Sequence, residues 1–127
     1  MSITLLYAGM LVLLLLALSW NVVRFRRRLR VGLGDGGHPE LQRAIRVHGN
    51  LLEYAPLGLI VMGLLEADGL PAVWLHAAGA TLVICRLLHA LGLSRSDGTS
   101  LGRFIGTLGT WMVLAGLALT AIARALN

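Results

Sequence analysis

The sequence contains no lysine and only one cysteine, and charged residues make up just 13% of it. The lone Cys85 excludes an internal disulfide and a paired-cysteine metal site. All eleven basic residues are arginines, whose planar forks of donors suit carboxylates and phosphates, so this usage indicates anion recognition. Because the arginines are interleaved with apolar runs and do not line a soluble face with aromatic stacking residues, we expect no nucleic-acid partner.

Apolar residues dominate what is present: 57% of the 127 residues are hydrophobic, too many for an ordinary soluble domain of this size. We expect four membrane-spanning helices, at about residues 3–23, 42–66, 72–93 and 103–125. At about 1.5 Å per residue, the first can cross a hydrocarbon layer of about 30 Å. Its positive charges follow it, unlike those of a cleaved signal peptide. The sequence therefore predicts an all-α integral membrane four-helix bundle, with antiparallel spans in one domain (1–127) within the lipid bilayer.

The positions of the arginines predict the orientation of the bundle. Seven of the eleven lie between positions 24 and 46, Arg95 and Arg103 flank the third connection, and the second connection has none. The positive-inside rule places both arginine-bearing connections in the cytoplasm. We therefore expect a multi-pass protein of a bacterial inner membrane with both termini periplasmic, and Arg124 is the one basic residue against the rule.

A polar stripe runs along the start of the second predicted helix. At about 100° per residue, five of its residues fall within an arc of about 100°: Arg43, Arg46, Asn50, Glu53 and Tyr54. Such a stripe cannot face lipid, so it must face a partner helix or a water-filled cleft near the membrane surface. In an antiparallel pair, Arg86 and His89 at the end of the third helix meet this stripe.

Two interpretations of these polar residues remain open. In the structural one, Glu53 and Arg86 form an interhelical ion pair, and Arg46 extends to the membrane surface. In the other, the residues bind an anionic ligand that carries more than one carboxylate and one ammonium. The arginines would bind the carboxylates, Glu53 the ammonium, and Asn50 and Tyr54 the neutral groups. Glutathione has that set of groups.

Other features carry less chemistry. The run Arg24–Arg30 is typical of a topology anchor that also attracts anionic lipid headgroups, although one of its arginines can belong to a site. The histidines lack metal-ligand spacing, so we expect no metal. The segment Gly32–Gly37 lacks the strand before it and the lysine-serine end of a phosphate loop, so we interpret it as a hinge.

The second-helix pattern Arg43-x-x-Arg46-x-x-x-Asn50-x-x-Glu53-Tyr54-x-Pro56 resembles the signature of the membrane-associated proteins in eicosanoid and glutathione metabolism, the MAPEG family. The resemblance covers most of the chain, because the four spans, the arginines closing the first, and Arg86 and Arg103 around the third connection also fall where the family pattern places them. The stretch 86–93 is most similar to a bacterial inner-membrane branch of the family.

This resemblance implies a homotrimer that binds glutathione, as co-substrate, in clefts between neighbouring subunits near the cytoplasmic face. The implied binding residues are Arg26 or Arg27 from one subunit, with Arg46, Asn50, Glu53, Tyr54, Arg86 and His89 beside them. The implied catalytic residue is Arg103, which would stabilise the glutathione thiolate. A lipophilic electrophile would arrive from the bilayer, and the activity would be of the glutathione transferase or peroxidase type.

The alternatives differ in class. His89 and Leu93 stand where better-known members of the family carry tyrosines, and Arg95 competes with Arg103 as the residue that stabilises the thiolate.

A non-catalytic membrane scaffold or a lipid- or anion-binding protein would use the arginines for topology and headgroups alone. A small multidrug carrier is disfavoured, because no carboxylate occurs between Met1 and Val23.

Overall fold

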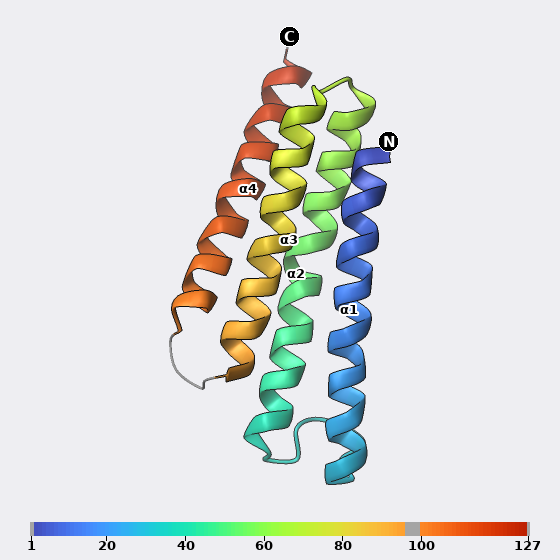
Figure 1. Cartoon of the computed structure of the whole chain (residues 1–127), viewed down its shortest axis with the longest axis vertical. Coiled ribbons are helices and arrows are strands. Elements are labelled where there is room, and N and C mark those ends of the chain that lie inside the picture. The colour runs from blue at the N-terminus through green and yellow to red at the C-terminus, as the bar shows by residue number, and fades with distance from the viewer. Residues whose placement is uncertain (1, 96–99, 127) are drawn as a thin grey trace.

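The computed structural model describes residues 2–95 and 100–126, except for the side chains of 93–95, so the predicted roles of Leu93 and Arg95 fall outside it. Four helices make up this part of the chain: α1 (Ser2–Leu29), α2 (Pro39–Ala67), α3 (Ala72–Arg95) and α4 (Leu101–Ala125). They run antiparallel, with both termini at the same end of the bundle (Figure 1). Each helix is long and apolar enough to cross a membrane, so the predicted fold class is confirmed.

The helix α1 continues past its apolar run and includes most of the arginine cluster. Arginine favours helix, and its long side chain carries the charge away from the apolar surface, so the helix has no reason to end at Val23. It ends where Arg30 adopts the left-handed conformation (φ 57°). There the Val31 N–H donates to the carbonyl of Arg26 at 3.1 Å, which satisfies one of the last carbonyls of the helix.

The helix α2 lies against both α1 and α3, and its start is set by a proline. Pro39 is its first residue and follows His38, which is extended, so the missing proline N–H falls where no intrahelical bond would form. Apolar side chains make up most of the interior of the bundle, with Met62 and Leu75 near the end that holds the termini and Val47 and Ala90 near the arginine-rich end. α1 and α4 lie at opposite edges of the bundle (Figure 1).

The helices α3 and α4 pack closely because glycines of α4 face α3. A Cβ added at Gly106 would lie 2.6 Å from the carbonyl oxygen of Cys85 and 2.7 Å from the nitrogen of His89. A Cβ at Gly109 would overlap the Cys85 sulfur. Small residues of this kind let helix backbones approach in a membrane. The close approach brings backbone carbonyls of α4 within reach of side chains on α3.

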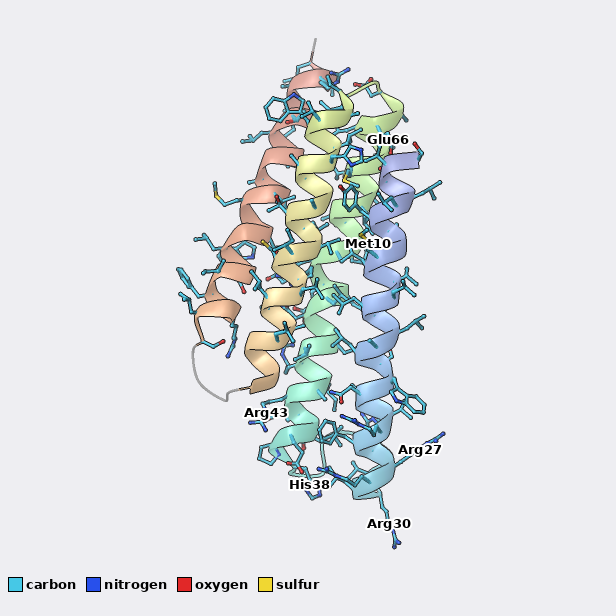
Figure 2. The ribbon with its side chains drawn as sticks, viewed as in Figure 1. Met10, Arg27, Arg30, His38, Arg43 and Glu66 are labelled. Atoms are coloured by element: carbon cyan, nitrogen blue, oxygen red, sulfur yellow. The ribbon has the colours of Figure 1, made fainter. Side chains whose placement is uncertain are left out.

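Carboxylates organise the end of the bundle that holds the termini. Both oxygens of Glu66, at the end of α2, accept hydrogen bonds from the first turn of α1, from Ile3 N at 3.0 Å and Thr4 N at 2.8 Å. Figure 2 shows Glu66 beside the beginning of that helix. Asp68 binds Arg124 through its carboxylate, and its carbonyl accepts a second bond from Arg124 at 2.7 Å. The arginine that departs from the charge rule is therefore paired.

Candidate functional site

The polar stripe of α2 is formed in the structure, and part of it is open. Arg46 and Glu53 lie two turns apart on the same helix, and Arg46 Nη1 binds Glu53 Oε1 at 3.3 Å. Their side chains remain 61% and 48% exposed. An ion pair that exposed contributes at most about 1 kcal/mol, so a ligand can separate the two groups at low cost.

The guanidinium of Arg86 is the buried group that the polar stripe of α2 meets on α3. Arg86, on α3, is only 2% exposed. Its Nη1 donates to Asn50 Oδ1 on α2 at 2.6 Å, and its Nη2 donates to the carbonyl of Gly106 on α4 at 3.0 Å. Its Cζ lies 5.4 Å from the centre of the Tyr54 ring, at a distance where a cation and an aromatic face attract each other. One side chain thus connects three helices.

The predicted interhelical ion pair between Glu53 and Arg86 is not what the structure shows. Glu53 binds Arg46, and Arg86 binds an amide oxygen and a backbone carbonyl. Its Nε is buried and has no hydrogen-bond partner in the described part of the chain. A buried guanidinium without a carboxylate keeps its positive charge uncompensated and favours an anion nearby.

His89 lies one turn after Arg86 and is buried against α4. Its backbone faces Gly106, and it is only 5% exposed. The carbonyl of Gly106 accepts a hydrogen bond from Arg86, whose other terminal nitrogen binds Asn50 of α2. The structure therefore brings Asn50 and Tyr54 of α2 together with Arg86 of α3 beside Gly106, one turn after Arg103 on α4.

Arg103 occupies the first turn of α4, where its backbone is firmly placed. Ser100 caps the helix, and its hydroxyl accepts a hydrogen bond from the Arg103 N–H at 3.3 Å. A Cβ added at Gly92 of α3 would lie 2.6 Å from that same nitrogen, so the start of α4 rests directly on α3. The Arg103 side chain is partly buried.

Arg26 and Arg27, at the end of α1, differ in their surroundings. Arg26 bends back to the α1–α2 connection, and its Nη1 donates to the carbonyl of Gly34 at 2.9 Å. Arg27 is exposed and extends away from the bundle, on the side opposite Arg43 (Figure 2). Within one chain, Arg27 therefore stays apart from the residues around His89.

Two further features bear on the chemistry of the site. No cluster of three or more metal-binding side chains occurs among the residues that the structure describes. An apolar hollow of about 590 Å³ lies between α3 and α4, from Trp74 and Thr120 to Thr81 and Gly109. It has no charged lining residue, so it is separate from the polar residues around Arg86.

The acceptor role of Gly106 is the part of the site that the sequence does not reveal. Its carbonyl oxygen accepts two hydrogen bonds, from Arg86 Nη2 at 3.0 Å and from the Thr110 hydroxyl at 2.7 Å. The available signal is indirect, because a glycine in a membrane helix marks a close approach but does not name the side chain that uses it.

Comparison with known proteins identifies the family of the chain. The model of the MAPEG family matches residues 4–123. The chain therefore belongs to the MAPEG family. It is 45% identical over 87 residues to the inner membrane protein YecN of Escherichia coli strain K12 and, equally, to that of strain O6:H1 (CFT073). The match covers 68% of this chain and 66% of each relative, just under two thirds of the relatives' own length.

Proposed function

We propose that this protein is a glutathione-dependent membrane enzyme of the transferase or peroxidase type, acting on lipophilic electrophiles. The observation that carries the proposal is the buried Arg86 guanidinium, which binds Asn50 of α2 and the carbonyl of Gly106 of α4, on a polar face that also carries the exposed Arg46 and Glu53. A tripeptide with two carboxylates and one ammonium needs such a set, and membership of the MAPEG family supports it.

The contacts around Arg86 suggest a division of roles among the binding residues. Arg46 and Glu53 are exposed and pair only loosely, so they are suited to exchange their contact for a ligand carboxylate and the ligand ammonium. Arg86 donates a hydrogen bond to Asn50, so these two residues fix the polar face of α2 against α3. Tyr54 stacks near Arg86 and leaves its hydroxyl for the peptide.

Arg103 would stabilise the thiolate. A free thiol has a pKa of about 8.5 and is mostly protonated at neutral pH, whereas a fixed guanidinium in a site of low dielectric favours the anion. The N-terminus of α4 adds a partial positive charge at the same place. The thiolate sulfur would then bond to the electrophilic atom, and the electrons of the broken bond would leave with the departing group or remain on the adduct.

The proposed assembly is a homotrimer in the inner membrane, with both termini periplasmic and the site on the cytoplasmic side. Arg27 is the better candidate to reach a neighbouring subunit, because it is exposed and extends away from its own bundle. Arg26 is already bound to its own connection. The relatives of the chain are inner membrane proteins by name, and the arginine-rich end suits the cytoplasmic side.

A non-catalytic anion-binding or scaffold protein is the second candidate. The observation in its favour is that Arg46 with Glu53, and Arg86 with Asn50 and Gly106, have partners inside one chain. A structural role would therefore need no ligand.

Calorimetry of glutathione binding to the purified protein in detergent tests the proposal. The intact chain should bind, and Glu53→Gln and Arg46→Ala should each weaken binding by about tenfold or more, as loss of one charge-assisted contact does. Arg30→Gln is the matched control, because Arg30 is exposed and lies beyond the end of α1. Absence of binding to the folded intact chain at millimolar glutathione would reject the proposal and favour the second candidate.

A further inference from the structure

A polar pocket lies between the end of α1 and the start of α2, apart from the residues around His89. Its volume is about 220 Å³. Three side chains of α1 and three residues of α2 line it: Asn21, Arg24, Phe25, Glu40, Arg43 and Ala44. Its lining therefore includes arginine, glutamate and asparagine beside an aromatic residue and a buried alanine.

The charged groups of this pocket are arranged by contacts within the chain. Arg24 Nη2 donates to Asn21 Oδ1 at 2.9 Å, which turns the guanidinium along the helix. Glu40 Oε1 lies 3.5 Å from Nη2 of Arg28, and the Glu40 side chain is 32% exposed. That contact is long and engages one oxygen, so the carboxylate can accept further donors. Arg24 and Arg28 both lie near the ring of Phe25, at 5.8 and 5.0 Å.

The place of the pocket along α1 identifies the kind of molecule that reaches it. Asn21 and Arg24 lie at the end of the apolar run, and Trp20 beside them is 62% exposed. Exposed tryptophan followed by arginine is typical of the layer where a membrane helix leaves the hydrocarbon and meets lipid headgroups. A phosphate in this layer belongs to a phospholipid, whose acyl chains lie beside the apolar part of the same helix.

We propose that this pocket binds the headgroup of a phospholipid that carries both a phosphate and an ammonium, as a phosphatidylethanolamine does. Arg24 binds the phosphate, for which an arginine fork is suited. Glu40 binds the ammonium. The proposal does not rest on glutathione binding, because neither Arg24 nor Glu40 belongs to the residues around His89.

The carboxylate is what distinguishes this site from a simple anchor. A cluster of arginines alone attracts any anionic lipid, and more strongly with each negative charge. Glu40 attracts the ammonium of a zwitterionic headgroup and gains no such attraction from an uncharged headgroup alcohol, so it gives selectivity for a zwitterionic lipid over one whose only headgroup charge is the phosphate. A carboxylate that served only to hold Arg28 would give no such preference.

Native mass spectrometry of the full chain in detergent tests this. The protein is titrated with phosphatidylethanolamine and, separately, with phosphatidylglycerol of the same acyl chains, and the bound lipids are counted. We expect a preference of about three- to fivefold for the zwitterionic lipid, the effect of one partly exposed charge pair. Glu40→Gln should abolish the preference while keeping phosphatidylglycerol bound, and Arg24→Ala should weaken binding of both lipids.

The controls separate this site from its alternatives. Arg30→Gln removes an arginine from the same end of α1 but not from the pocket, so it should leave both lipids bound as before. Equal binding of the two lipids to the intact chain, or a preference that survives Glu40→Gln, would overturn the proposal. So would a loss in Arg30→Gln as large as that in Arg24→Ala, which indicates general attraction to charge. Soluble phosphoethanolamine should not displace the lipid, and displacement at equal concentration would assign the pocket to a soluble phosphate ester instead.

Discussion

Arg86 donates a hydrogen bond from Nη2 to the carbonyl oxygen of Gly106 at 3.0 Å, so a side chain of α3 is fastened to the main chain of α4. The same guanidinium holds Asn50 of α2 at 2.6 Å. Gly106 lies one turn after Arg103 on α4. The position of Arg103 relative to the polar stripe of α2 therefore depends on Arg86, even if Arg86 itself never contacts a ligand.

Gly106→Ala should destabilise the protein. The added methyl carbon would lie 2.6 Å from the carbonyl of Cys85, in backbone that cannot give way easily. We expect a loss of about 1–3 kcal/mol, as in other overpacked interiors, measured as a lower midpoint of thermal unfolding in detergent. Gly116→Ala is the matched control, because no atom outside the adjoining residues and local backbone of its own helix lies within 4 Å of the added carbon. Equal midpoints for the two variants would contradict the close packing of α3 on α4.

Arg86→Lys should also lower the stability, because one ammonium group cannot reach both Asn50 and Gly106 in place of a fork. Loss of one buried, charge-assisted hydrogen bond costs about 1.5–3 kcal/mol. Thermal unfolding measures the effect, and Arg30→Lys at an exposed position should have almost none. A variant with lysine at 86 that unfolds at the temperature of the intact chain would show that the connection of the three helices is dispensable.

Arg103→Gln should lower the rate of glutathione conjugation by about 10²–10³-fold, the usual cost of one preorganised charge-stabilising group, and should weaken glutathione binding much less. Because Arg103 is proposed to favour the thiolate, its removal raises the pKa of the bound thiol, and the rate should reach half its maximum at a higher pH. Rates with a chromophoric electrophile across pH measure both effects. Arg30→Gln serves as the control, and an unchanged pH profile in Arg103→Gln would assign the thiolate to another group.

The proposed orientation can be tested with single cysteines, because the natural Cys85 is buried and gives little background labelling. Ser2→Cys lies at the end that holds the termini, and Leu33→Cys lies in the α1–α2 connection, where Leu33 is 92% exposed. A membrane-impermeant maleimide added to intact cells should label Ser2→Cys and spare Leu33→Cys. In lysed cells both should react. The reverse pattern would invert the orientation and place the candidate site outside.

The fold could be predicted from the sequence because its determinants are local. Apolar runs of sufficient length, interrupted by glycine and proline, define four spans without knowledge of their packing. The polar face of α2 could also be predicted, because the spacing of Arg46, Asn50 and Glu53 on a helix fixes their direction.

The partners within the candidate site could not be predicted in the same way. One of the two interpretations pairs Glu53 with Arg86 across the helices, yet Glu53 binds Arg46 on its own helix. Arg86 and Arg26 both bind backbone carbonyls, of Gly106 and Gly34. Every residue has a carbonyl, so a sequence pattern cannot tell which one the packing leaves accessible.

The bonds of Glu66 to the first turn of α1 have a mechanical consequence. They hold one end of a continuous helix at a fixed height against α2, and about 36 Å further along that helix stands Arg27. A sliding, piston-like displacement of α1 would have to break both bonds before it moved the arginines. The level at which Arg27 meets the membrane surface is thus set by a carboxylate at the opposite end of the molecule.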